Sequence, residues 1–202
     1  MRPSLRLLRR PWLRYALALT LFPAIATAAS GPQSVADSSV SSLPRSELSS
    51  LRFAVTPDLS KAVATFENTP RTRDVSEEWK QCKFTPIHLG TLGAAVVVEW
   101  NPVKAPNASM INIYLPRNGQ YRLLLANGGF GPTLLPGPNP VPDLVFGATG
   151  GVCHATYSRY RWLNEHYEVN ACNQETEGKD GNCAIISCAN RKLPTFPNPF
   201  PN

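Results

Sequence analysis

The sequence predicts a mainly β protein in which antiparallel hairpins form a small sheet, a sandwich or a blade-like domain, with minor α-helix near the N-terminus. Between residues 94 and 169, β-branched and aromatic residues fall in runs of strand length, several of which alternate with polar residues. Glycine and proline separate these runs, as expected of turns. Four cysteines between residues 153 and 188 predict a disulfide-pinned C-terminal region.

The first 28 residues have the pattern of a secretory signal peptide. Met1–Arg14 holds five arginines and no acid, Tyr15–Ile25 is apolar, and Ala26-Thr27-Ala28 fits a cleavage site. The apolar run is shorter than the roughly 20 residues that a membrane-spanning helix needs. We therefore predict a periplasmic or secreted protein with a cleaved signal. Sec export is favoured, and the Arg9-Arg10 pair makes twin-arginine export the alternative.

Most of the basic character of the chain lies in this signal segment. The chain has 20 Lys and Arg against 14 Asp and Glu, and without the five signal arginines 15 basic residues remain, a net charge of +1. No basic run remains that could neutralise a row of phosphates, so we predict no nucleic-acid partner. No later apolar run reaches membrane length, so we predict no stable membrane insertion after cleavage.

Composition divides the rest of the chain into three parts. Residues 29–50 are rich in serine and predict a flexible linker, because they offer little apolar surface to bury. Residues 51–193 are predicted to form a single β-rich domain, and the proline-rich residues 194–202 a loose tail. Short helices are predicted over Ser60–Phe66, with serine as N-cap, and over Ser76–Lys80, with acids in the first turn.

The first predicted strands are a buried strand and a β-hairpin. Ala94–Trp100 is almost continuously apolar, as in a strand buried on both faces. Met110–Leu115 alternates, the turn Pro116–Gly119 contains the Asn-Gly pair favoured in tight hairpins, and Gln120–Ala126 returns. The dense prolines and glycines of Asn127–Pro142 predict an ordered loop or edge connection, which is the first place to look for a function.

A second hairpin is predicted closer to the C-terminus. Asp143–Gly147 has the composition of a short strand, and Ala155–Trp162 pairs with Glu165–Val169 across a turn at Leu163-Asn164. This hairpin is mainly aromatic on one face and basic on the other. Aromatic faces can bind sugars or peptides but more often pack against a neighbouring sheet, and packing is favoured here. The residues of a possible binding surface are Phe130, Tyr160, Trp162 and Tyr167.

The cysteines predict structural disulfides. The candidates for bridges are Cys153, Cys172, Cys183 and Cys188, which leaves Cys82 as a possible free thiol. With the turn as predicted, Cys153 and Cys172 come within two residues of facing each other, an offset that a shifted turn or bulges would close. Cys183 would then pair with Cys188 in an irregular end, although Cys172–Cys188 and Cys82–Cys153 stay open. Because no CxxC is present, no metal or cofactor is predicted.

Catalysis would need a cysteine with a nearby histidine base, or a pair of carboxylates. The candidate pairs are Cys82 with His88 and Cys153 with His154, with His166 at the second hairpin. Neighbours along a strand point to opposite faces, so adjacent residues rarely act together, and no catalytic residue is assigned. Whether the protein is an enzyme stays open, with the negative favoured. The remaining carboxylates are interpreted as solvated surface charge: Asp143, Glu165 and Glu168.

One stretch of the sequence resembles a known family. Val141–Ala148 (VPDLVFGA), followed by Tyr157–Trp162 (YSRYRW) and Tyr167, is similar to the repeat unit of FG-GAP and VCBS β-propeller proteins. It is also similar to uncharacterised exported bacterial proteins that carry one such unit. The resemblance implies a strand followed by a hairpin, and a single unit cannot form a propeller. The family's calcium loop needs aspartates where this chain has Gly137–Pro142, so calcium binding is not implied.

Together these features predict an exported, non-catalytic binding or accessory protein that acts in the cell envelope or outside the cell. Its partner would be a protein or an envelope polysaccharide. One alternative is a small exported hydrolase that uses Cys/His or carboxylate chemistry. The other is a secreted enzyme inhibitor, because small disulfide-pinned β domains present loops rigidly.

Overall fold

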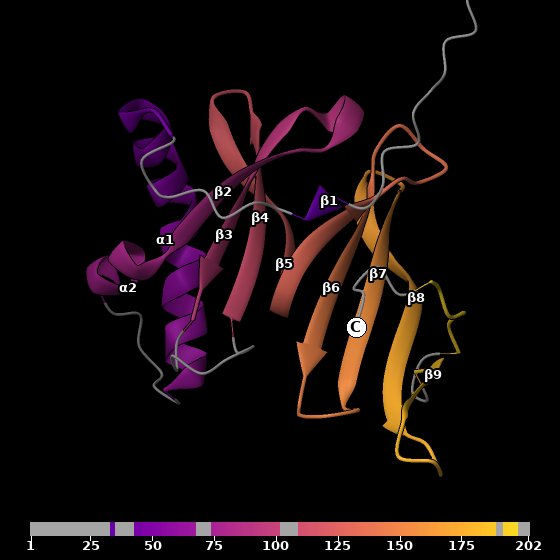
Figure 1. Cartoon of the computed structure of the whole chain (residues 1–202). Coiled ribbons are helices and arrows are strands. Elements are labelled where there is room, and N and C mark those ends of the chain that lie inside the picture. Colours follow the sequence, from indigo (N-terminus) through magenta and orange to yellow (C-terminus); the bar gives the residue numbers. More distant parts are fainter. Residues whose placement is uncertain (1–32, 35–42, 68–73, 102–108, 189–191, 198–202) are drawn as a thin grey trace, which may run out of the picture.

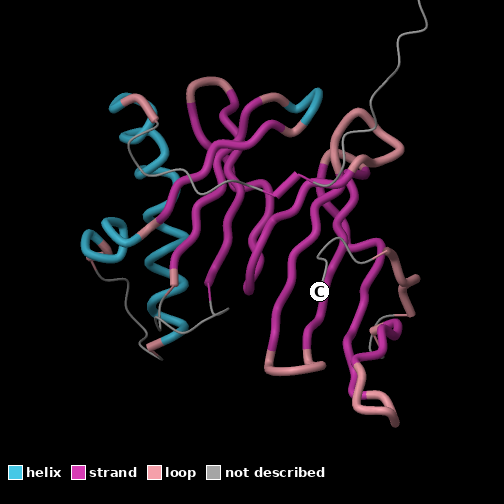
Figure 2. Tube along the Cα trace, in the orientation of Figure 1, coloured by secondary structure: helices cyan, strands magenta, loops and turns pink. Residues whose placement is uncertain are grey.

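The structure is a computed structural model of the whole chain, and it describes residues 33–34, 43–67, 74–101, 109–188 and 192–197 (Figure 1). Eight strands, β2 to β9, follow one another in chain order across one open antiparallel sheet, and β1 (Gln33–Ser34) pairs with β5 beside this path. Helices lie at one end of the sheet (Figure 2). The predicted fold class is confirmed. The predicted signal segment, residues 1–28, lies outside the described residues.

Helix α1 (Arg45–Phe66) covers one face of the first strands. The predicted helix began only at Ser60, so its start was wrong, and residues 45–50 are helical where a linker was predicted. Pro57 lies within the helix, exposed on the side away from the sheet. The helix is held by an apolar stripe that repeats at every fourth position and packs on the sheet: Leu51, Val55, Leu59 and Val63.

Helix α2 (Ser76–Gln81) confirms the second helix prediction. Its first turn contains Glu77 and Glu78, as expected from the attraction between acids and a helix N-terminus. Asp74 precedes the helix and accepts hydrogen bonds from the backbone N–H and the hydroxyl of Ser76. These two hydrogen bonds hold the pKa of Asp74 below its ordinary value.

The first half of the sheet contains β2 (Lys83–His88), β3 (Ala94–Trp100) and β4 (Ser109–Arg117). Strand β3 is buried on both faces, as predicted, because its alternate residues pack under α1 and against the inner core. The hairpin between β4 and β5 turns at Asn118 and Gly119, whose φ angles of 52° and 77° are the positive values expected of an Asn-Gly turn.

Strand β5 (Gln120–Leu135) is the longest strand and joins the two halves of the sheet. It pairs with β4 as far as Gly129 and with β6 from Phe130 onward, with a register shift between Phe130 and Thr133. The prediction of a loop beginning at Asn127 was therefore wrong for residues 127–135. Glycine is needed here because the backbone at Gly129 and Gly131 has φ of 107° and 113°.

The second half of the sheet consists of β6 (Asp143–Thr149), β7 (Ala155–Leu163), β8 (His166–Glu177) and β9 (Cys183–Ser187). The predicted hairpin is present, but its turn lies one residue later, at Asn164 and Glu165, which both have positive φ. The end predicted to be irregular after residue 172 contains the rest of β8 and all of β9.

The inner faces of the two halves share one core. Residues of β2, β3 and β4 pack there against Leu144, Phe146 and Tyr167 of the second half. On the outer face of the second half, Phe196 is buried against Val145. The Asn173 amide donates to the Phe196 carbonyl at 2.7 Å and its oxygen accepts from the Phe196 N–H at 3.0 Å. Phe196 lies in residues 194–202, which were predicted to form a loose tail. Its burial and these two hydrogen bonds hold this part of the segment against the sheet.

The four candidate cysteines form two disulfides, Cys153–Cys183 and Cys172–Cys188. The favoured Cys153–Cys172 bridge was wrong, whereas the Cys172–Cys188 alternative is correct and Cys82 is free. Ser158 rather than Cys153 is the residue that pairs with Cys172 across β7 and β8. The disulfides indicate an oxidising environment. Among the described residues, no helix is long and apolar enough to cross a membrane.

Candidate binding cleft

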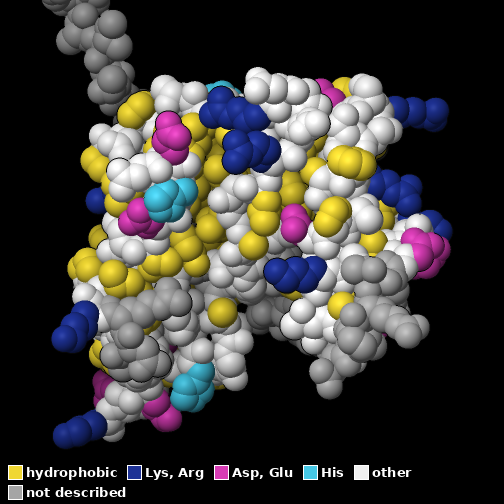
Figure 3. Space-filling model, turned by 180° about the vertical axis from the view of Figure 1, so that it is seen from behind, with side chains coloured by type: hydrophobic (Ala, Val, Ile, Leu, Met, Phe, Trp, Pro, Cys, Tyr) yellow, Lys and Arg dark blue, Asp and Glu magenta, His cyan; other side chains and the backbone are white. Residues whose placement is uncertain are grey.

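The candidate site is a cleft on the inner face of the sheet, between the turn of the β4–β5 hairpin and the turn of the β7–β8 hairpin. Its volume is ≈ 620 Å³. Seen from behind, hydrophobic side chains gather along the middle of this face, with Lys or Arg side chains and a histidine around them (Figure 3). The cleft is lined by Leu92, Leu115, Arg117, Arg122, Leu123, Leu124, Trp162, Glu165 and His166.

The apolar wall of the cleft continues the inner core. Leu115 is buried, and Leu92, Leu124 and Trp162 pack against the same core as partly buried residues. Leu92 comes from the short 3₁₀ turn η2 (Gly90–Leu92). The cleft therefore offers a ligand an apolar surface that rests on well-packed side chains.

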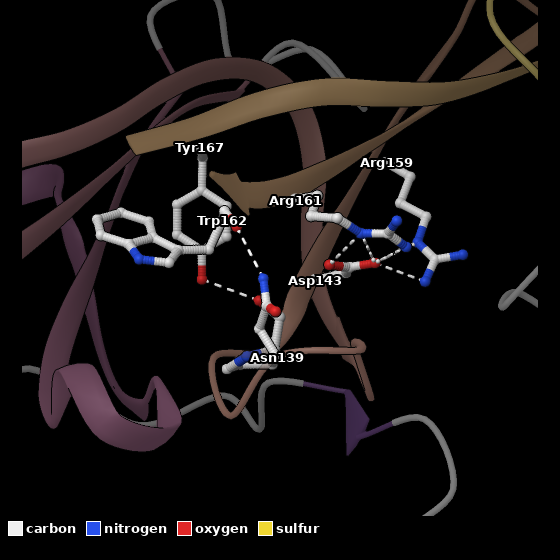
Figure 4. Close-up of polar contacts among 7 residues, drawn as sticks. Asn139, Asp143, Arg159, Arg161, Trp162 and Tyr167 are labelled. Carbon is white, nitrogen blue, oxygen red and sulfur yellow. Dashed lines mark hydrogen bonds and ion pairs between the residues drawn. The ribbon is translucent and has the colours of Figure 1, made fainter. Parts of the chain in front are cut away.

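Trp162 is held in place by its neighbours. Its ring meets that of Tyr167 edge to face, with ring centroids 5.2 Å apart. The amide of Asn139 donates to the Trp162 carbonyl at 3.1 Å, and the Tyr167 hydroxyl donates to the Pro142 carbonyl at 2.9 Å (Figure 4). Burial, and then the charge of Asp143, raises the pKa of Tyr167, so its hydroxyl stays a donor. The loop before β6 thus fixes the wall of the cleft.

Two arginines stand on the opposite wall. Arg122 pairs with Leu115 across the hairpin, and Arg117 lies two residues beyond Leu115 in β4. Because residues two apart in a strand share a face, both arginines follow Leu115 on the inner face. Both are exposed, and neither side chain makes an ion pair or hydrogen bond with the described part of the chain. Two guanidinium groups are therefore available to an anion.

The β7–β8 hairpin supplies the other polar groups. His166 Nε2 lies 2.7 Å from the Glu168 carboxylate, and its Nδ1 lies 2.9 Å from the Asn164 carbonyl. Glu165, in the turn, also lines the cleft. Because both ring nitrogens have partners, the His166 ring is held in a fixed orientation at the cleft.

A buried charge cluster of Asp143, Arg159 and Arg161 lies on the outer face of β6 and β7. Asp143 is fully buried and accepts hydrogen bonds from Arg159 Nε at 2.7 Å and Arg161 Nη2 at 3.0 Å (Figure 4). The interpretation of Asp143 as solvated surface charge was wrong, because both arginines of the basic face converge on it. This cluster joins β6 to β7 and does not line the cleft.

The predicted aromatic surface is divided between the two faces of the sheet. Tyr160 packs edge to face on Phe146 in the inner core, with ring centroids 5.6 Å apart. Phe130 packs on the other side against Tyr157, at 6.1 Å. Core packing, the favoured interpretation, accounts for most of this set. Trp162 is the one member of this set that lines the cleft; the other three do not: Phe130, Tyr160 and Tyr167.

The cysteine–histidine pairs are not assembled. The Cys82 thiol is buried and donates to the Glu78 carbonyl at 3.4 Å. Burial, and then the nearby Glu78 carboxylate, raises the pKa of this thiol to about 12. His88 is exposed at the far end of β2, about 20 Å away along an extended strand. Cys153 is in a disulfide, and the described residues contain no group of three or more His, Cys, Asp or Glu that could hold a metal.

A thiol titration should find one reactive group per chain, and only after unfolding. In native protein at about pH 8, Cys82 should resist a disulfide reagent, because it is buried and its pKa is raised to about 12. In denaturant without reductant, one thiol should react rapidly. Rapid reaction of the native protein would contradict the burial of Cys82, and five reactive thiols would contradict both disulfides.

The arginine pair was not among the predicted site residues. Its signal in the sequence was the alternation Leu115-x-Arg117 followed, after the Asn-Gly turn, by Arg122, which places both basic side chains on the face of Leu115. Strand β5 bends where it passes from β4 to β6, near Gly129 (Figure 2). That the face of Leu115 meets Trp162 depends on this bend, which the local sequence pattern does not encode.

Comparison of the chain with models of protein families, with curated proteins and with solved structures finds no match in any of the three. The resemblance of Val141–Tyr167 to an FG-GAP or VCBS repeat unit therefore stays a prediction.

Proposed function

We propose that this is an exported, non-catalytic binding protein that holds an acidic sugar unit of an envelope polysaccharide in the cleft. The observation that carries the proposal is the position of Arg117 and Arg122, without partners in the described part of the chain, in the same cleft as Trp162. The signal-like segment at residues 1–28 and the two disulfides support export to the periplasm or the exterior.

The chemistry of the cleft matches a ring that carries a carboxylate. A guanidinium group binds a carboxylate through two parallel hydrogen bonds, and two such groups favour an anion over a neutral ligand. The indole of Trp162 and the neighbouring leucines provide apolar surface for the ring itself. The volume of ≈ 620 Å³ falls within the roughly 300–1,000 Å³ typical of small-ligand sites.

A binding role fits the cleft better than hydrolysis does. His166 is engaged on both nitrogens, and Glu165 is the other acidic or basic group of that wall. Cys82 is remote from the cleft lining and protonated. These three residues therefore do not form a nucleophile paired with a base, and no feature of the cleft favours an inhibitor over a carbohydrate-binding protein.

The test compares an oligouronate with a neutral oligosaccharide of equal length, by calorimetry on the chain without its predicted signal segment. Arg122→Ala and Arg117→Ala should each weaken oligouronate binding about tenfold or more, because a hydrogen bond to a charged group contributes roughly 1.5–3 kcal/mol. Arg45→Ala, an exposed arginine of α1, is the matched control and should bind like wild type. Added salt should weaken binding of the acidic probe.

Equal affinity for acidic and neutral probes, or unchanged binding by both arginine variants, would contradict the proposal. Shortening of the oligouronate during incubation, followed by mass spectrometry, would assign an enzyme instead.

A further inference from the structure

Strand β9 is an exposed edge of the sheet. It pairs with β8 on one side, and on its other side it pairs with none of the described strands. All five of its residues are exposed, including Ile185 at 46% and Ile186 at 43%. An edge strand of this kind presents backbone N–H and C=O groups that can pair with another strand.

The two edges of the sheet differ in their protection. Strand β2, at the opposite edge, carries Lys83 and Pro86, and both residue types discourage pairing at an edge. Strand β9 has the sequence CAIIS, with no charge and no proline, and its pairing with β8 has no register shift. A charged side chain and a proline, two of the devices against edge pairing, are thus present in β2 and absent from β9.

Both disulfides hold β9 in place. Cys183, its first residue, is bonded to Cys153 before β7, and Cys188, directly after the strand, is bonded to Cys172 in β8. A terminal strand held by covalent bonds at both ends cannot fray away from the sheet. It therefore offers a partner a fixed edge at low entropic cost.

We propose that β9 pairs antiparallel with β9 of a second copy of this chain, about a two-fold axis at Ile185. This register is self-complementary, because Ile185 faces its own counterpart, Ala184 faces Ile186, and Cys183 faces Ser187. Alternate side chains point to opposite faces, so exposed isoleucines are covered on both faces of the sheet. Because β9 itself carries no charge, no like charges face each other across the two paired strands, and a continuous sheet runs through the dimer.

Sedimentation velocity of the chain without its predicted signal segment tests this pairing, at concentrations up to about 1 mM, since five-residue strands make a small and weak interface. The dimer fraction should rise with concentration. Ile185→Lys should weaken dimerisation at least about tenfold, because two lysines then face each other across the axis. Phe53→Lys is the matched control, because Phe53 is an exposed apolar residue (82%) of α1, which packs on the strands at the other end of the sheet, and this variant should dimerise like wild type.

Hydrogen exchange gives a second measurement that needs no variant. The amides of residues 183–187 should become more protected as concentration rises, while those of the opposite edge, residues 83–88, should not change. A wild-type chain that stays monomeric throughout the range overturns the proposal. So does a dimer that Ile185→Lys leaves intact, since it would use another surface. Protection of β9 only when an extended peptide is added would assign the edge to a different partner.

Discussion

Replacing Asp143 with asparagine is expected to destabilise the protein by about 3–5 kcal/mol, the usual cost of removing one partner from a buried charge cluster. The side chain of Asp143 is 1% exposed, and those of Arg159 and Arg161 are 18% and 28% exposed. Asparagine keeps the shape of the side chain but not its charge. Two neighbouring guanidinium groups would then repel each other with no carboxylate between them, at the junction of β6 and β7.

Urea unfolding of the variant and the wild type measures this loss. Glu77→Gln is the matched control, because it removes a carboxylate from an ion pair with Lys80 whose side chains are 75% and 66% exposed. That change should stay within about 0.5 kcal/mol, since exposed pairs contribute little to stability. A loss below about 1 kcal/mol for Asp143→Asn would mean that the two arginines are solvated well enough without their shared carboxylate.

The sequence predicted best those elements whose signals are local. The β4–β5 hairpin follows from alternation on both sides of Asn118-Gly119, and that dipeptide has the φ values which the turn requires. Strand β3 follows from an unbroken apolar run. In both cases neighbouring residues alone determine the conformation.

Elements that depend on distant partners were missed. The serine-rich start of α1 has little helical signal of its own, and its four-residue stripe becomes decisive only when a sheet is present to cover it. Similarly, residues 127–135 resemble a loop because glycine and proline weaken isolated strands. In the structure the neighbouring β6 supplies a partner that this composition alone does not indicate.

The predicted disulfide pairing was wrong because the predicted register of β7 against β8 was wrong. The favoured Cys153–Cys172 bridge assumed a turn at residues 163–164 and a free choice of bulges. The actual turn at Asn164 and Glu165, with a register shift between Arg159 and Tyr160, puts Ser158 opposite Cys172. Cys153 lies before β7 with φ of 54°, where it meets Cys183 at the start of β9. The later turn moves the pairing by two residues and the register shift by one more, so Cys172 faces Ser158 instead of Ala155.

The candidate cleft was the least predictable feature, because it is made by two hairpins that the bend in β5 brings together. The aromatic prediction did find Trp162, which lines the cleft, but it missed Arg117 and Arg122 on the other wall. One half of β5 carries Arg122, and the other half pairs with β6 next to the strand that carries Trp162. The geometry of this bend therefore sets the separation of the two walls.

Replacing Gly129 with alanine should disrupt this bend and cost at least about 3 kcal/mol of stability. Two effects add, because φ of +107° strains an L side chain and an added Cβ would lie 2.0 Å from the Gly147 carbonyl oxygen. Backbone strain contributes about 1–3 kcal/mol and overpacking a similar amount. Since the obstacle is backbone of β6, relief requires the two strands to separate, and the cleft walls should move with them.

Gly119→Ala separates the two effects. Gly119 also has positive φ, at +77°, but an added Cβ there would meet nothing within 4 Å. Gly119→Ala should therefore reduce stability only through backbone strain, by roughly 1–2 kcal/mol. Urea unfolding of both variants measures the difference, and equal losses would show that β6 yields to a methyl group at little cost. In that case the close approach of β5 to β6 would not be what fixes the bend, and Gly129→Ala should leave the proposed binding of an oligouronate unchanged.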